Sequence, residues 1–220
     1  MTRWDHGVAE MRAYYAARAP YYDAVYLKPE RRADIAFLVG HLPQRLGGRS
    51  VLEIACGTGY WTQHIAPAAA RVVALDGTAE PLAFARLRPG AQAAVFHQLD
   101  AYALPDSLGR FDAAFAGLWL SHVPIAARRP FLRGLHARLA PGARVLFIDN
   151  NEVQLRDFPI AHTDEDGNTY QLRTLRDGST HRVLKNFPGR AELEALVAPH
   201  ACDVVYRSLE NFWLLEYELA

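Results

Sequence analysis

The chain has 220 residues, of which 50% are hydrophobic and 22% are charged, an ordinary balance for a globular protein. Lys plus Arg and Asp plus Glu each number 24, so the net charge gives no general attraction to nucleic acid or to an anionic membrane. The sequence shows no signal-peptide pattern, no apolar run long enough to span a bilayer, and only two cysteines. We therefore expect one cytoplasmic domain over residues 1–220, with reduced thiols.

The N-terminal residues predict two helices. Residues 8–18 are rich in alanine and predict a helix that ends near Pro20, and residues 29–41 predict a second one. Five short apolar runs follow, each bounded by Gly, Pro or Asp, as is typical of strands buried on both faces. These runs are residues 50–55, 71–76, 94–100, 112–120 and 144–149.

Helical patterns lie between several of these runs, over residues 61–66, 80–87 and 127–139. Strands that alternate with helices predict a parallel sheet covered on both faces. Near the end of the chain, residues 190–198 predict a helix, and residues 203–210 and 212–219 predict two strands. Because a single residue joins these strands, they must pair antiparallel. We expect a Rossmann-like, doubly wound α/β fold with a seven-stranded, mostly parallel sheet and one antiparallel strand.

Residues 151–188 do not follow this alternation. Within them, two strand-like runs, residues 169–175 and 179–185, flank the dipeptide Asp177-Gly178, a strong hairpin signal. The segment therefore predicts a β-hairpin inserted after the fifth strand. It would lie above the C-terminal edge of the sheet, where ligands bind in such folds, and would form a cap over the substrate.

The sharpest local signal follows the first strand. Residues 51–60 run from an apolar strand through a turn of small residues toward a helix, and Gly57 and Gly59 permit a tight reversal with close approach of a ligand. Asp76 and Asp100 end the second and third strands. A carboxylate at Asp76 can accept both hydroxyls of a ribose, and one at Asp100 can accept an adenine amino group. With Glu53, they suit a nucleoside that also carries a positive centre.

These residues resemble motif I of the class I S-adenosylmethionine-dependent methyltransferases of small-molecule type. The motif here is Glu53-x-Ala55-x-Gly57-x-Gly59, with Ala55 where a glycine is usual. The resemblance implies S-adenosylmethionine (SAM) as cofactor: Glu53 would order the turn and the methionine amino end, residues 55–59 would contact the methionine part, Asp76 would hold the ribose, and Asp100 with Ala101 the adenine. Further residues expected at the cofactor are Cys56, Trp61, Gly77, Tyr102 and Leu118.

Residues 14–23 resemble the N-terminal helix that folds over the cofactor in small-molecule members of this family. The resemblance implies that residues 1–45 form a helical lid and that Tyr14, Arg18 or Tyr22 bind the cofactor carboxylate. The alternative is that these aromatic side chains only pack the helix on the domain. For the Gly turn the alternative is a plain strand–helix connection, and for Asp76 it is a cap of the next helix.

His122, at the end of the fourth strand, is the best candidate for a general base, because a neutral imidazole is available at cytosolic pH. The alternative is a structural histidine before Pro124. Asp149-Asn150 at the end of the fifth strand resembles the metal-dependent catechol-type methyltransferases, but the acidic ligand that those enzymes carry after the fourth strand is missing. We therefore expect no metal.

The predicted lid is rich in aromatic residues, which favours a planar or aromatic metabolite as the methyl acceptor. These residues are Trp4, Tyr14, Tyr15, Tyr21, Tyr22 and Tyr26, and Trp119 could join them from the sheet. The acceptor motif of amino-directed nucleic-acid methyltransferases is absent. Two other functions remain open: a nicotinamide-dependent oxidoreductase, and a non-catalytic SAM-binding regulatory subunit. We expect a monomer or a homodimer.

Overall fold

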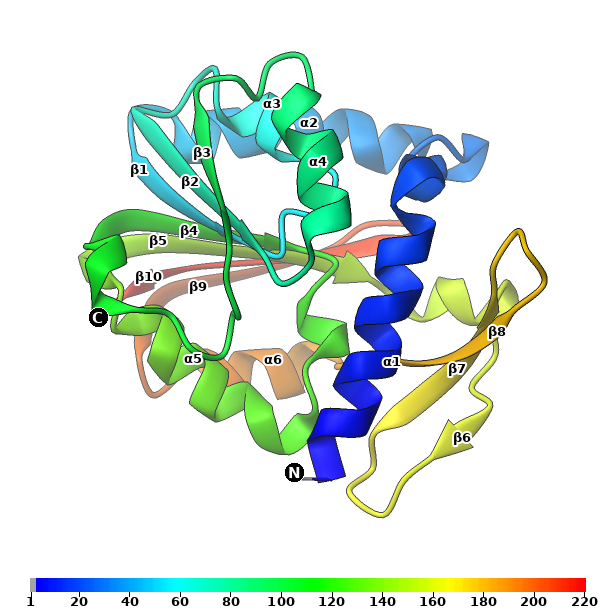
Figure 1. Ribbon diagram of the computed structural model, residues 1–220. Helices are drawn as coiled ribbons and strands as arrows, with labels where there is room; N and C mark the ends of the chain where they lie inside the picture. Colours follow the sequence, from blue (N-terminus) through cyan, green and yellow to red (C-terminus); the bar gives the residue numbers. More distant parts are fainter. Residues whose placement is uncertain (1–2) are drawn as a thin grey trace.

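The computed structural model describes the backbone of residues 3–220 and the side chains of residues 9–220 (Figure 1). Trp4 of the predicted aromatic group lies outside the described side chains. The helices are α1 (Arg3–Arg18), η1 (Ala19–Val25), η2 (Pro29–Arg31), α2 (Arg32–Leu46), α3 (Thr62–Ile65), α4 (Ala79–Leu87), η3 (Asp106–Leu108), η4 (Leu120–His122), η5 (Ile125–Ala127), α5 (Arg128–His136), η6 (Glu152–Arg156) and α6 (Arg190–Val197), where η marks a 3-10 helix. The strands are β1 (Ser50–Ile54), β2 (Arg71–Asp76), β3 (Ala94–Gln98), β4 (Phe111–Gly117), β5 (Leu139–Asn150), β6 (His162–Thr163), β7 (Thr169–Thr174), β8 (Thr180–Leu184), β9 (Ala201–Ser208) and β10 (Phe212–Leu219).

Seven strands form the main sheet in the order β3-β2-β1-β4-β5-β10-β9. β1 to β5 pair parallel, and β10 runs antiparallel to both of its neighbours, β5 and β9. The fold class predicted from the sequence, a mostly parallel sheet with one antiparallel strand, is therefore confirmed. The strand order reverses between β1 and β4, and in open α/β sheets the crevice at such a reversal is where ligands bind.

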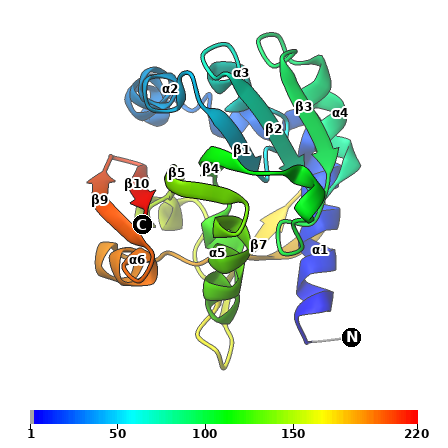
Figure 2. The same cartoon turned by 90° about the vertical axis from the view of Figure 1, so that its left-hand side faces the viewer.

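Alternate residues of the central strands feed two separate cores. Val51 and Val72 face one side of the sheet, where they pack with apolar side chains of α2, α3 and α4. Leu52 and Val73 face the other side and pack with α5 and α6. Figure 2 shows α2 and α6 on opposite sides of the sheet. This burial on both faces explains why the strands are continuous apolar runs.

The boundaries differ from the sequence-based ones mainly around β4 and β5. Residues 118–120 were expected to continue β4, but the strand ends at Gly117 and Leu118 adopts a left-handed conformation with φ of 58°. The chain turns there because the backbone N–H of Ser121 donates to the Asp149 carboxylate at 2.9 Å. β5 begins at Leu139, five residues before the predicted start, because Leu139 already pairs with Phe111.

The predicted hairpin is present and has a third, short strand. β7 and β8 pair antiparallel around the turn at Asp177-Gly178, and β6 pairs with the outer side of β7. The Asp177 carboxylate accepts the backbone N–H of Ser179 at 2.9 Å, and Gly178 has a φ of 87°. α1 packs along β8, so the N-terminal helix lies between the main sheet and this second sheet (Figure 1).

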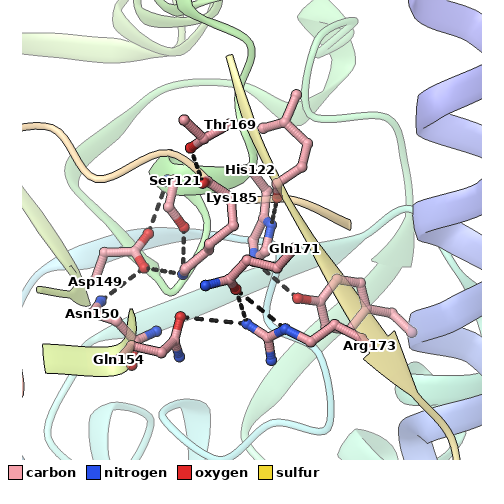
Figure 3. Close-up of polar contacts among 11 residues, drawn as sticks. Ser121, His122, Asp149, Asn150, Gln154, Thr169, Gln171, Arg173 and Lys185 are labelled. Carbon is pink, nitrogen blue, oxygen red and sulfur yellow. Dashed lines mark hydrogen bonds and ion pairs between the residues drawn. The ribbon is translucent and has the colours of Figure 1, made fainter. Parts of the chain in front are cut away.

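A buried ion pair fastens the hairpin to the main sheet. Lys185, just after β8, lies 2.8 Å from Asp149 of β5, and both side chains are at most 2% exposed. The Lys185 Nζ also donates to the Ser121 hydroxyl at 2.6 Å (Figure 3). A buried charge is tolerated only with such partners, so this contact fixes where the second sheet sits.

We predict that Lys185→Met lowers the free energy of unfolding by about 3–5 kcal/mol, because it leaves the Asp149 carboxylate buried without a counter-charge. Urea unfolding monitored by circular dichroism measures the change. Lys28→Met is the matched control, since Lys28 pairs with Asp157 at a partly exposed site, and such a pair contributes less than about 1 kcal/mol. Equal losses in the two variants would contradict this assignment.

Candidate functional site

A cavity lies at the C-terminal ends of β1, β2 and β4 and is closed from above by α1 and η1. Most of the residues predicted from the sequence line it: Tyr22, Glu53, Ala55, Cys56, Gly57, Trp61, Asp76, Gly77, Asp100, Ala101, Tyr102, Leu118 and His122. Three predicted residues, Tyr14, Arg18 and Gly59, do not line it. The C-terminal edge of the sheet therefore gathers most of the predicted residues around one cavity, and Tyr14, Arg18 and Gly59 lie outside its lining.

The turn after β1 has left-handed residues at three alternate positions. Ala55, Gly57 and Gly59 have φ values of 52°, 56° and 74°. A side chain at Gly57 would meet nothing within 4 Å, which leaves the backbone there open to the cavity. At Gly59 a Cβ atom would lie 3.0 Å from that of Ala85 in α4. Gly57 therefore permits ligand approach, whereas Gly59 permits close helix packing.

Glu53 is a buried carboxyl group without a basic partner among the described residues. Its side chain is 1% exposed, its Oε2 atom has no hydrogen-bond partner, and burial raises its pKa to about 8. A buried acid of this kind is stabilised by a ligand that brings a cation or hydrogen-bond donors. The ammonium group of a methionine moiety has both properties.

The Asp76 carboxylate contacts both the turn after β1 and the residue that precedes α4. Its Oδ2 atom accepts the Gly57 backbone N–H at 3.0 Å, and its Oδ1 atom accepts the backbone N–H and the hydroxyl of Thr78 at 2.9 and 2.6 Å. In the part of the chain that the structure describes, no side-chain hydrogen bond caps α4, whose N-cap is Thr78, so the alternative of Asp76 as a helix cap is wrong, and its contact with a ribose remains a prediction. An ionised carboxylate has about four lone-pair sites and three are used here, so Oδ2 keeps about one free site for a ribose hydroxyl.

Asp100 reaches across the cavity mouth to the N-terminal helix. Its Oδ1 atom accepts the Tyr102 backbone N–H at 2.9 Å, and its Oδ2 atom lies 3.0 Å from Nη2 of Arg12. The Arg12 side chain also lies beside Gly77, and both members of the ion pair are almost half exposed. Arg12 was not predicted, because nothing near it in the sequence points to a partner 88 residues away.

His122 is buried on the acceptor side of the cavity and has partners on both ring nitrogens (Figure 3). Nδ1 lies 2.6 Å from the Leu184 carbonyl oxygen, and Nε2 lies 2.9 Å from the Tyr15 hydroxyl. Because a carbonyl can only accept, Nδ1 carries the proton and Nε2 accepts from Tyr15. Burial and the nearby Lys185 charge lower the pKa of His122 to about 3, so the ring is neutral.

The aromatic residues of the N-terminal segment divide into two groups. Tyr15 and Tyr22 line the cavity together with Trp119. Tyr26 also reaches it, but its ring is stacked on Tyr60 at 3.8 Å between centroids. Tyr14 is buried outside the cavity and accepts a hydrogen bond from Arg18 at 2.8 Å. Packing and cavity lining are thus both present, which the sequence pattern alone left open.

The structure adds residues that sequence reasoning did not assign to a site. Met11 and Arg12 of α1 line the cavity, together with Thr58 and Trp119, which were expected in the turn and among the aromatic residues. The Thr58 hydroxyl donates to the Asp23 carboxylate at 2.6 Å, which ties the N-terminal segment to the cofactor turn. These contacts join segments far apart in the chain, so a local motif could not have found them.

Comparison with known proteins supports the same assignment. A family model described as a methyltransferase domain matches residues 51–142. The chain is 35% identical over 126 residues to the malonyl-[acyl-carrier protein] O-methyltransferase of Erwinia billingiae, covering 53% of this chain and 45% of that protein. It is 34% identical over 106 residues to the ubiquinone biosynthesis O-methyltransferase of Azotobacter vinelandii, covering 47% and 45%. The chain thus spans about half the length of these curated relatives.

Solved structures match along the whole chain. The DhpI–SAH complex is 32% identical, with a TM-score of 0.80 and coverage of 98% of both chains. The DhpI–SAM–HEP complex is 34% identical, with a TM-score of 0.79 and coverage of 97% of this chain and 98% of that one. The acidic residues at the strand ends, the tight turn after β1 and the strand order of the sheet agree with these comparisons. This chain belongs to the class I SAM-dependent methyltransferases.

Proposed function

We propose that this methyltransferase binds SAM along the Glu53, Asp76 and Asp100 edge and methylates a small molecule held beside Tyr15, Tyr22, Trp119 and His122 in the same cavity. The observation that carries this proposal is Glu53, a buried carboxyl group with one unpaired oxygen at the inner end of the cavity. It fits the methionine ammonium, while Asp76 and Asp100 supply acceptors for the ribose and the adenine. When bound, SAM supplies a methyl group on a positively charged sulfur.

The protein's own contribution is mainly placement. Gly57 and the left-handed Ala55 bend the backbone around the methionine part, and Leu118, also left-handed, opens the path from the turn toward the acceptor side. The lid excludes water because Met11 and Tyr15 of α1 close the cavity. Holding the two reactants in line can supply a large share of the rate acceleration of a transfer that needs no further activation.

The acceptor side contains Tyr15, Tyr22, Trp119 and His122. Their rings fit the expectation of a planar or aromatic acceptor, which remains a prediction. DhpI, the protein in the similar solved structures, forms a complex with SAM and HEP, so HEP is the first acceptor to test here. Monomer or homodimer, a cytosolic location and the absence of nucleic-acid binding remain predictions. Among residues 3–220, no helix combines the length and apolar character needed to cross a membrane.

Asp76→Ala tests the cofactor site directly. We expect affinity for S-adenosylhomocysteine (SAH) to fall at least about tenfold in calorimetry, because a charge-assisted hydrogen bond to the ribose is lost. Asp106→Ala is the control, since that carboxylate is 94% exposed and pairs only with Arg138 at the surface. Unchanged SAH affinity in Asp76→Ala would contradict the site. Release of SAH from SAM in the presence of HEP or of a metabolite panel separates an enzyme from a non-catalytic SAM-binding subunit.

Glu53 should make cofactor binding depend on pH. Burial raises the pKa of Glu53 to about 8, so below that pH the free protein carries a proton on Glu53. The ammonium group of the ligand needs the ionised carboxylate, so its binding must displace this proton. Affinity for SAH should therefore fall by up to about tenfold for each pH unit below 8. In Glu53→Gln the affinity for SAH should no longer depend on pH. The same should hold for binding of 5′-methylthioadenosine to the wild type, because that nucleoside lacks the amino group of the methionine part. An equally steep profile in Glu53→Gln would refute the assignment.

His122 is proposed to act on the acceptor side, and its predicted role as general base remains a prediction. With Nε2 occupied by Tyr15, any proton from the acceptor would pass through the Tyr15 hydroxyl. We expect His122→Ala to lower kcat by about 100-fold or more, with SAH affinity unchanged, because Tyr15 loses its only described hydrogen-bond partner. Tyr15→Phe should show the same pattern. Full turnover in His122→Ala would remove this residue from the mechanism.

A further inference from the structure

We infer that the methyl acceptor carries a negatively charged oxygen group, a carboxylate or a phosphoryl group, which Arg18 and Arg173 bind. This inference rests on the proposed function, since it names the substrate class of the same site. It begins from two basic side chains that have no acidic partner among residues 9–220. Lys185, which is also buried on this side, is paired with Asp149. The two arginines therefore define the surface that we assign to the acceptor.

Arg173 lies in β7, points toward the main sheet and is 5% exposed (Figure 3). Its guanidinium contacts only neutral groups: the amide oxygen of Gln171 at 3.2 Å, that of Gln154 at 3.4 Å, and the ring of Phe158 at 3.8 Å from the centroid. Burial lowers its pKa, and no ion pair offsets that cost. A guanidinium has five N–H donors in a planar fork, so donors remain for a ligand.

Arg18 ends α1 and approaches the same place from the lid. Its Nη1 atom donates to the Tyr14 hydroxyl at 2.8 Å, and its guanidinium lies 5.2 Å from the centroid of the Tyr22 ring. The Tyr14 hydroxyl also interacts with Arg173, and the Arg18 charge acts on Arg173. Two cations that repel each other thus converge on one phenol oxygen, an arrangement that an anion placed between them would stabilise.

Neither Arg18 nor Arg173 forms an ion pair among residues 9–220, although the Asp157 charge acts on Arg173 as well as on Arg31. The Lys185 charge is matched by Asp149, and Arg31 lies in the field of Asp157 and Glu30. The acidic residues that line the cavity, Glu53, Asp76 and Asp100, all belong to the cofactor end. The cavity therefore has an acidic end that suits a sulfonium nucleoside, whereas Arg18 and Arg173 lie next to its other end, outside the lining residues. A buried indole N–H without a partner, at Trp119, adds a further donor on the acceptor side.

Two tyrosines connect this basic cluster to the cavity. Tyr15 and Tyr22 both line the cavity, and their ring centroids are 5.9 Å apart. Arg18 covers the Tyr22 ring from behind, and the Arg173 charge acts on Tyr15. An acceptor whose anionic group passes between these two rings would meet both guanidinium groups. This combination fits a small molecule with one anionic group and an apolar or planar body.

The experiment uses the full chain loaded with SAH. Acetate and inorganic phosphate are each titrated at constant ionic strength, with acetamide as the neutral counterpart of acetate, and binding is followed by NMR chemical shifts. We expect saturable binding of at least one anion and none of acetamide. Which anion binds identifies a carboxylate or a phosphoryl group as the ligand. Arg18→Gln and Arg173→Gln should each weaken that binding at least about tenfold, as loss of a charge-assisted hydrogen bond predicts.

Arg182→Gln is the matched control, because Arg182 is an exposed residue of β8 without an ion pair and its loss changes the net charge equally. It should bind the anion as the wild type does. Arg173→Lys keeps the charge and replaces Arg173→Gln if that variant loses SAH affinity; it should bind the anion more weakly than the wild type, because the planar fork is lost.

Three outcomes would overturn the inference while the proposed function stands: SAH binds but neither anion saturates, acetamide binds as well as acetate, or the Arg18 and Arg173 variants bind the anion like the wild type. The last outcome would leave Arg173 as a residue that only packs the hairpin against Gln154 and Gln171. If SAH does not bind the wild type, the proposed cofactor site is wrong, and this result is obtained independently of the anion titration.

Discussion

The contact between Lys185 and Asp149 organises the acceptor half of this methyltransferase. Asp149 ends β5 and accepts the Ser121 backbone N–H, which turns the chain after β4 and places His122. The residue before Lys185, Leu184, presents the carbonyl oxygen that fixes the His122 ring, and that ring in turn holds the Tyr15 hydroxyl of α1. One charge pair in the interior thus connects sheet, hairpin and lid, because each later contact needs the earlier one in place.

The distribution of charge follows from the fold in the same way. Parallel strands present their C-terminal ends at one edge, so acidic residues at the ends of β1 and β2 and after β3 gather on one side of the cavity. The second sheet brings its basic residues next to the acceptor end, outside the cavity lining, since β8 packs along α1. A net charge of zero for the whole chain therefore conceals a strong local polarity.

Sequence patterns predicted the sheet and the cofactor half because both depend on local signals. Apolar runs define buried strands, and the Glu53-to-Gly59 turn, Asp76 and Asp100 each occupy a strand end. The acceptor half was predicted poorly, since its contacts join distant segments. Lys185 and Asp149 are 36 residues apart, and Tyr15 and His122 are 107 apart. The early stop of β4 also depends on such a contact, because the apolar residues 118–120 carry no local signal for a turn.

The ion pair between Arg12 and Asp100 has a consequence for the order of events. If Asp100 receives the adenine amino group, the nucleoside and the N-terminal helix compete for the same oxygen atoms. Binding of the nucleoside would then break the ion pair between Arg12 of α1 and Asp100. Tyr15, on the next turn of α1, would still be bound to His122 on the acceptor side. The methyl acceptor would then enter past α1 only after the nucleoside has bound. The two reactants would bind in a fixed order, and this order would protect the activated methyl group from water.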